Sequence, residues 1–139
     1  RKMFHWSGSV DRPAENGEGQ RKALRSRAGV LTLGELQIAL VPGEIYPELV
    51  LAKVPDPAPA GADFPEAPVE PSLLSQLTAK HRWVLGLAQD EVGYIMPRRQ
   101  WDAKEPFTYD YKKPPYGEIN SLGPDTAPLL LPLYRDLAR

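Results

Sequence analysis

The feature that most constrains the fold is an apolar run, residues 36–41, that ends abruptly at a Pro-Gly pair. A run with so few polar residues is typical of a strand covered on both faces. A second β-rich run, residues 30–33, precedes it, and a Gly-Glu pair separates the two. Gly34 can adopt the positive φ that a tight hairpin turn requires. The sequence therefore predicts a β-hairpin whose second strand is buried.

Helical and strand patterns alternate along the rest of the chain. Residues 46–53 ("YPELVLAK") predict a short helix with Pro47 in its first turn, where a missing N–H costs nothing. A second short helix is predicted to start at Ser72. Residues 81–89 ("HRWVLGLAQ") predict a second buried strand.

The chain closes with a Leu-rich helical pattern. Asp125 or Thr126 is placed to cap this final helix, and Pro132 is expected to kink or interrupt it. Strands interleaved with helices indicate an α/β fold, with a mixed sheet and flanking helices.

Two segments are expected to lie outside the sheet and its helices. Residues 1–28 are polar and are interpreted as a loop or exposed turn. Residues 55–71 hold six of the chain's 16 prolines and predict a semi-rigid extended connection on the surface. The remainder of 29–139 is expected to form a single core, for which a hydrophobic fraction of 42% is sufficient.

Composition excludes several kinds of partner and site. The net charge of −1 provides no field that would attract nucleic acid or an anionic membrane. Without cysteine the chain has neither a disulfide framework nor a thiolate metal site. No apolar run approaches the ~20 residues of a membrane span. No signal-peptide pattern opens the sequence, which begins in mid-pattern and is expected to be a piece of a longer product.

Residues able to carry chemistry are few. The two histidines, His5 and His81, lack metal-ligand spacing, and neither a nucleophile elbow nor a phosphate-binding loop is present. Two polar residues follow predicted strands, Glu44 after the Pro-Gly turn and Tyr94 after the second buried strand. Binding sites in α/β sheets form outside strand ends. The residues alone leave open whether these two belong to a site or are a turn acid and a packed tyrosine.

Three sequence blocks, in this order, resemble the C-terminal part of the catalytic domain of neutral (neutral/alkaline, non-lysosomal) ceramidases. The similarity extends over 29–139 with gaps, and the Pro-rich segment 55–71 is then an insertion. The three blocks are "VPGE", "GLAQDEVGYI" and "LGPDTAPLLLPLYRDLAR".

The resemblance implies a zinc-dependent amidase that cleaves the N-acyl bond of ceramide-like lipids. In that family zinc is held by two histidines, a glutamate and a tyrosine. The glutamate of "VPGE" corresponds to Glu44, and the tyrosine of the Tyr-Ile pair corresponds to Tyr94. A further family tyrosine, which contacts the reacting amide, aligns with Tyr116.

The family's histidine motifs and active-site serine precede anything in this chain. The resemblance therefore implies that the chain is inactive alone and requires the N-terminal part of the catalytic domain, in the same polypeptide or as a separate chain. It also implies a secreted, periplasmic or membrane-surface location. The alternative is a ceramidase-like scaffold or binding module without catalysis, and a third possibility is an isolated structural module whose similarity is accidental.

Overall fold

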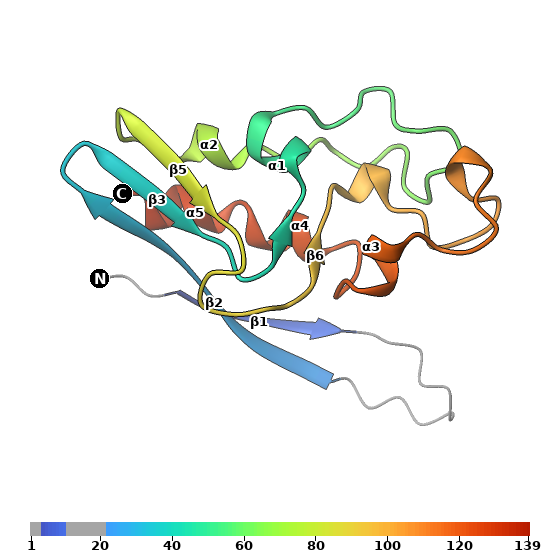
Figure 1. Ribbon diagram of the computed structural model, residues 1–139, viewed down its shortest axis with the longest axis horizontal. Coiled ribbons are helices and arrows are strands. Elements are labelled where there is room, and N and C mark those ends of the chain that lie inside the picture. The colour runs from blue at the N-terminus through green and yellow to red at the C-terminus, as the bar shows by residue number, and fades with distance from the viewer. Residues whose placement is uncertain (1–3, 11–21) are drawn as a thin grey trace.

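The chain has a mixed α/β fold (Figure 1). The computed structural model describes the backbone of residues 4–10 and 22–139, and the side chains from Ser26 onward. The strands are β1 (Phe4–Val10), β2 (Lys22–Leu33), β3 (Leu36–Leu40), β4 (Glu44–Ile45), β5 (His81–Leu85) and β6 (Tyr94–Ile95). The helices are α1 (Pro47–Leu51), α2 (Leu73–Gln76), α3 (Tyr116–Ile119), α4 (Thr126–Leu130) and α5 (Leu133–Leu137), with 3-10 turns at Arg98–Gln100 and Thr108–Asp110.

The strands form two sheets. The larger has the order β1-β2-β3-β5, in which β2 and β3 are antiparallel and β3 and β5 are parallel. The smaller is a parallel pair of β4 and β6. The predicted hairpin is confirmed, since Gly34 turns the chain between β2 and β3 with φ of 57°. None of the described helices has the length and apolar character that a membrane crossing requires.

The N-terminal prediction was wrong where it can be compared with the structure. We expected a loop or exposed turn over 1–28, but β1 pairs in antiparallel register with the first half of β2. An antiparallel ladder is built from main-chain groups, so a polar composition does not prevent it. The part of the prediction that falls on 1–3 and 11–21 lies outside the described residues.

The short helices start as expected. Pro47 occupies the first turn of α1, and the Ser72 hydroxyl caps α2 by accepting a hydrogen bond of 3.2 Å from the Ser75 N–H. The final helical pattern is interrupted at Pro132, which separates α4 from α5. Asp125 precedes α4 but does not cap it, because its carboxylate pairs with Arg98 at 2.7 Å.

The Pro-rich segment 55–71 contains no helix or strand, in agreement with the expected extended connection. It is not wholly superficial, however. Glu70 is buried and accepts a hydrogen bond of 2.8 Å from the Arg98 backbone N–H. Arg99 donates to the Pro65 carbonyl oxygen. These contacts fix the segment against the turn that follows β6.

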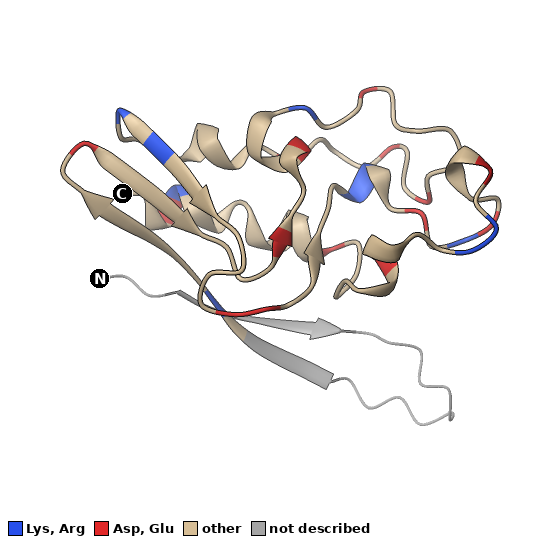
Figure 2. Ribbon diagram, in the orientation of Figure 1, with Lys and Arg blue, Asp and Glu red and all other residues tan. Residues whose placement is uncertain are grey.

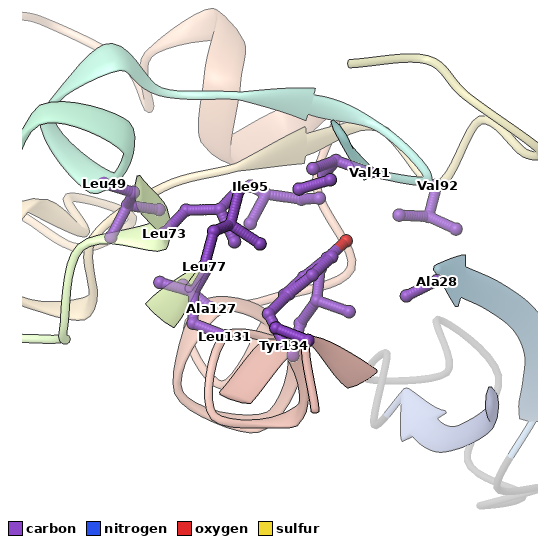
Figure 3. Close-up of a cluster of buried hydrophobic side chains, with 13 residues drawn as sticks. Ala28, Val41, Leu49, Leu73, Leu77, Val92, Ile95, Ala127, Leu131 and Tyr134 are labelled. Carbon is purple, nitrogen blue, oxygen red and sulfur yellow. The ribbon is translucent and has the colours of Figure 1, made fainter. Parts of the chain in front are cut away.

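The core lies between one face of the sheet and the helices. Helix α5 contacts β2 and α2 contacts β5, both on the side that lies behind the sheet in Figure 1. Tyr134 of α5 is fully buried at the centre, and its hydroxyl donates a hydrogen bond of 2.8 Å to the Leu40 carbonyl oxygen. The side chains around it that Figure 3 labels are Ala28, Val41, Leu49, Leu73, Leu77, Val92, Ile95, Ala127 and Leu131.

One buried polar side chain joins three parts of this core. Gln37 in β3 donates a hydrogen bond of 3.0 Å to the Ala138 carbonyl oxygen at the end of α5. Its side-chain oxygen accepts from the backbone N–H groups of Thr78 and Ala79, at 2.7 and 3.1 Å, just before β5. Gln37 thereby links β3 to both the C-terminal helix and the start of its parallel neighbour.

Replacing Gln37 with leucine is expected to lower the free energy of unfolding by about 3 kcal/mol, because two buried N–H groups lose their acceptor and the Ala138 carbonyl loses one of its two donors. Urea unfolding monitored by circular dichroism measures the loss. Lys112→Ala, at an exposed loop position away from Gln37, is the control and is expected to change stability by less than about 0.5 kcal/mol. A Gln37→Leu protein as stable as the control would show that the amide does not join these elements.

The prediction of a second buried strand was also wrong. The sequence predicted a buried strand over 81–89, whereas β5 ends at Leu85 and its residues are mostly exposed, with Trp83 at 60%. By contrast Gln37, Ile38 and Ala39 in the middle of β3 are buried, as predicted. The two strands differ in position: β3 has a neighbour on each side, and β5 is the last strand of the sheet as far as the structure describes it.

Candidate functional site

The smaller sheet brings Glu44 and Tyr94 together. The two are directly opposite each other in the β4–β6 register, although 50 positions separate them in the sequence. The pairing is fixed by backbone hydrogen bonds from the Glu44 N–H to the Gly93 carbonyl oxygen, at 3.0 Å, and from the Tyr46 N–H to the Ile95 carbonyl oxygen, at 2.9 Å. The turn after β3 therefore places an exposed carboxylate beside a tyrosine.

Glycine permits this close approach. A Cβ on Gly43 would overlap the Gly93 carbonyl oxygen, so a side chain there would push β4 and β6 apart. Gly93 has φ of +84°, and a Cβ on it would overlap the Asn120 carbonyl oxygen. That same oxygen accepts a hydrogen bond of 2.9 Å from the Tyr94 N–H. The two glycines thus hold Tyr94 between Glu44 and the segment after α3.

Three tyrosines form a cluster around Tyr94, which we call the tyrosine cluster: Tyr46, Tyr94 and Tyr116. The Tyr94 ring centroid lies 6.1 Å from that of Tyr46 and 5.8 Å from that of Tyr116, with interplanar angles of 87° and 78°. Edge-to-face contacts of this kind are favourable for aromatic pairs. Tyr116 is 70% exposed at the start of α3, so its hydroxyl is accessible to a bound molecule.

Sequence reasoning missed Tyr46 and Gly117. A Cβ on Gly117 would lie 2.5 Å from the Tyr46 hydroxyl oxygen and 2.9 Å from the Met96 methyl carbon. The absence of a side chain at Gly117 therefore lets α3 settle on Tyr46 and carries Tyr116 to the Tyr94 ring. The only hint in the sequence was the position of Tyr46, two residues after Glu44.

The surroundings of the cluster are acidic and disfavour phenolate. The pKa of Tyr94 is raised, chiefly by the neighbouring Glu44 carboxylate. Burial raises the pKa of Tyr46, and the negative charge of Glu118 adds to the effect. Burial also raises the pKa of Glu118. Without a cation the raised pKa values keep Tyr46 and Tyr94 protonated, and a cation bound at Glu44 would reverse the effect on the pKa of Tyr94.

The site offers two oxygen donors to a metal, the Glu44 carboxylate and the Tyr94 hydroxyl. Over the residues that the structure describes, no three His, Cys, Asp or Glu side chains form a metal-binding group. His81 begins β5, at the end of the sheet opposite to Glu44. The side chain of His5 lies outside the described residues. Two oxygen donors are fewer than the roughly four ligands that a zinc ion takes, so the described residues do not make a complete zinc site.

An apolar groove of about 490 Å³ leads away from Glu44, between α1 and the end of β5. We call it the α1–β5 groove. Its lining consists of Glu44, Ile45, Pro47, Val50, Leu51, Val84, Gly86 and Leu87. Glu44 is the only charged residue among them.

Comparison with known proteins found no relative of this chain. No family model matches the chain, and neither a curated protein nor a solved structure does.

Proposed function

We propose that this chain is the C-terminal part of the catalytic domain of a zinc-dependent amidase resembling neutral ceramidases. In this proposal Glu44 and Tyr94 are two of the zinc ligands, and Tyr116 contacts the reacting amide. The observation that carries the proposal is that the three residues chosen from the sequence lie together, Glu44 beside Tyr94 in the β4–β6 register and the Tyr116 ring against that of Tyr94.

The carboxylate of Glu44 and the phenol of Tyr94 are both chemically able to bind zinc. Carboxylate oxygen is a regular zinc ligand, and phenolate oxygen is a rarer one that a nearby cation favours. When bound, zinc would polarise the amide carbonyl and lower the pKa of a water molecule to about 7. The residues of this chain hold fixed positions: Glu44 is set by the Pro-Gly turn, and Tyr94 by its bond to the Asn120 carbonyl oxygen.

The remaining ligands must come from elsewhere. Two imidazoles complete the proposed set, supplied by the N-terminal part of the domain in the same polypeptide or as a separate chain. The substrate is then an N-acyl amide of the ceramide type. Tyr116, exposed at the edge of the tyrosine cluster, is positioned to donate a hydrogen bond to the amide from its hydroxyl.

Zinc titration calorimetry in the presence of imidazole, which stands in for the missing histidines, tests the proposal. Glu44→Gln is expected to weaken zinc binding by about tenfold or more, since even an outer-shell change costs a metal site 10–100-fold. Glu66→Gln in the Pro-rich segment removes an equal charge from an exposed position and is expected to leave the affinity unchanged.

If Glu44→Gln binds zinc as tightly as the wild-type chain, the zinc proposal fails. The alternative, a ceramidase-like scaffold or binding module, would then be favoured by the exposed apolar side chains of β2 and β5, such as Leu33 and Trp83.

A further inference from the structure

Three carboxyl groups lie close together where helix α3 meets the loops beside it. Glu118 belongs to α3, Asp102 follows the 3-10 turn Arg98–Gln100, and Asp63 belongs to the Pro-rich segment. The negative charges of Asp102 and Asp63 both act on the Glu118 carboxyl group, which also lies near the Asp102 backbone N–H. Figure 2 shows acidic positions in red on α3 and on the loops near it. We call Asp63, Asp102 and Glu118 the carboxylate cluster.

Two oxygens of this cluster are buried and have no hydrogen-bond donor among the described residues. Asp102 is only 1% exposed, and its Oδ2 accepts hydrogen bonds from the Thr108 N–H, at 2.9 Å, and from the Thr108 hydroxyl. Its Oδ1 has no donor, and neither has Oε2 of Glu118. A buried carboxylate oxygen without a donor is costly, above all when it is charged. The cluster therefore requires at least one further donor.

No ion pair among the described side chains balances the charge of the cluster. The acids in those ion pairs are Glu35, Asp56, Asp125 and Asp136. The other titratable groups on this side of α3 are Tyr46, which the charge of Glu118 affects, and Glu48 of α1, which also acts on Tyr46. Neither can contribute positive charge. Since no three His, Cys, Asp or Glu side chains in the described part form a metal-binding group, a proton is the positive charge that fits here.

Glu118 is the group best placed to hold that proton. Its pKa is raised, first by burial and further by the charges of Asp102 and Asp63, although nearby backbone N–H groups oppose the rise. Protonation turns its carboxylate into a donor, and the Asp102 Oδ1 is an acceptor in the same cluster. One proton thus removes one of two neighbouring like charges and can serve both oxygens that lack a donor.

Helix α3 connects the carboxylate cluster to the tyrosine cluster. It has only four residues, so its position depends on packing rather than on its own stability. Glu118 and Tyr116 both belong to it, and the Tyr116 ring contacts that of Tyr94. Just after α3, the Ser121 hydroxyl donates a hydrogen bond of 2.7 Å to the Tyr94 carbonyl oxygen. A displacement of Glu118 would therefore reach Tyr116 through a single helical turn.

We propose that the carboxylate cluster is a pH-sensitive switch that controls the position of α3. With one proton in the cluster, Glu118 stays beside Asp102 and Tyr116 stays against Tyr94. When that proton is lost, the Glu118 and Asp102 carboxylates repel each other, Glu118 turns toward solvent, and α3 separates from the tyrosine cluster. The switch itself does not require zinc. Only its consequence for a substrate, that Tyr116 meets the amide in the protonated state, rests on the proposed function.

The direction of the pH dependence follows from the raised pKa of Glu118. The folded chain holds the proton more tightly than the unfolded chain, in which glutamate has its ordinary pKa of 4.5. The stabilisation from this group is therefore complete below that ordinary value and is lost as the pH rises through the raised pKa. We expect α3 to be held most firmly under mildly acidic conditions.

NMR of the 139-residue chain in metal-free buffer, from about pH 5 to about pH 8, tests the switch. In the wild-type chain we expect the nuclear Overhauser effect between the Tyr94 and Tyr116 rings to weaken as the pH rises. The protection of the Tyr94 amide, corrected for intrinsic exchange, is expected to fall by about threefold or more. The carboxyl carbon signal of Glu118 is expected to titrate over the same range.

Glu118→Gln is the decisive variant, because it keeps the shape of the side chain and cannot ionise. It is expected to retain the ring contact and the Tyr94 protection across the whole range. Glu66→Gln, at an exposed position, is the matched control and is expected to follow the wild-type chain. Asp102→Asn removes the neighbouring charge and is expected to move the transition to lower pH. The comparison with Glu118→Gln stands independently if this last variant does not fold.

Three outcomes would overturn the proposal. A ring contact that is equally strong at both ends of the pH range in the wild-type chain would show that water, not a proton, satisfies the buried oxygens. The same pH dependence in Glu118→Gln would assign it to another group. Recovery of the contact at high pH on addition of Ca²⁺ would show that the cluster binds a metal ion. A pH-dependent contact, combined with zinc binding that Glu44→Gln leaves unchanged, would retain the switch and remove the zinc proposal.

Discussion

Replacing Gly93 with alanine is expected to lower the free energy of unfolding by about 3–4 kcal/mol and to displace Tyr94 from Glu44. Two costs combine in this variant. A non-glycine residue at positive φ costs about 1–2 kcal/mol, and overpacking a fixed site costs about 1–3 kcal/mol more. The second cost arises because the new Cβ overlaps the Asn120 carbonyl oxygen, which must move away.

Gly34→Ala separates the two costs. Gly34 also has positive φ, at +57°, but a Cβ on it meets nothing within 4 Å. Urea unfolding of both variants is expected to show a loss of about 1–2 kcal/mol for Gly34→Ala, from backbone conformation alone. Equal losses in the two variants would contradict the tight contact between Gly93 and Asn120 on which the position of Tyr94 depends.

Replacing Tyr134 with alanine is expected to have the other large effect, a loss of about 4 kcal/mol, as for other buried aromatic side chains cut to alanine. The side chain is fully buried between the sheet and the helices, and burial raises the pKa of its phenol, so the hydroxyl stays protonated. The cavity would lie where α5 meets β3, at the hydrogen bond to the Leu40 carbonyl oxygen.

Tyr134→Phe isolates that hydrogen bond and is expected to cost about 1–2 kcal/mol, because a buried carbonyl loses its donor. Tyr109→Ala, at an exposed position, is the control and is expected to be nearly neutral. Thermal and urea unfolding measure all three. A Tyr134→Ala protein as stable as the Tyr109→Ala control would contradict the placement of α5 against the sheet.

Local sequence patterns predicted those parts of the fold that depend only on neighbouring residues. The hairpin at Gly34 follows from backbone freedom, and the start of α1 follows from the fixed φ of Pro47. The separation of α4 from α5 follows from the missing N–H of Pro132. Each of these depends on a few neighbouring residues and requires no knowledge of what lies across the sheet.

The expectations that failed depended on distant partners. The apolar sequence of β5 predicted burial, but burial requires a neighbour that the described chain does not place there. The polar N-terminal segment gave no sign of pairing with β2, which depends on main-chain register. Asp125 or Thr126 was expected to cap the final helix, but the Asp125 carboxylate pairs with Arg98, 27 positions away in the sequence, and the Thr126 hydroxyl donates to the Gly123 carbonyl oxygen.

The candidate site also combines residues that local sequence patterns could identify with residues that they could not. Glu44 and Tyr94 were chosen from the sequence as strand-end residues, and the structure places them opposite each other. Their roles as zinc ligands and the role of Tyr116 remain predictions. Tyr46 and Gly117 could not be found, because their importance lies in the contact between β4 and α3, which no local pattern encodes.

The most direct test of the central claim, that Glu44 and Tyr94 bind one zinc ion, is the near-ultraviolet difference spectrum of the chain titrated with zinc and imidazole at neutral pH. A metal beside Tyr94 is expected to lower the pKa of its phenol and produce tyrosinate absorption. We expect the tyrosinate band in the wild-type chain and in Tyr111→Phe, a much weaker band in Glu44→Gln, and none in Tyr94→Phe. Zinc binding without a tyrosinate band, or a band that persists in Tyr94→Phe, would contradict the account.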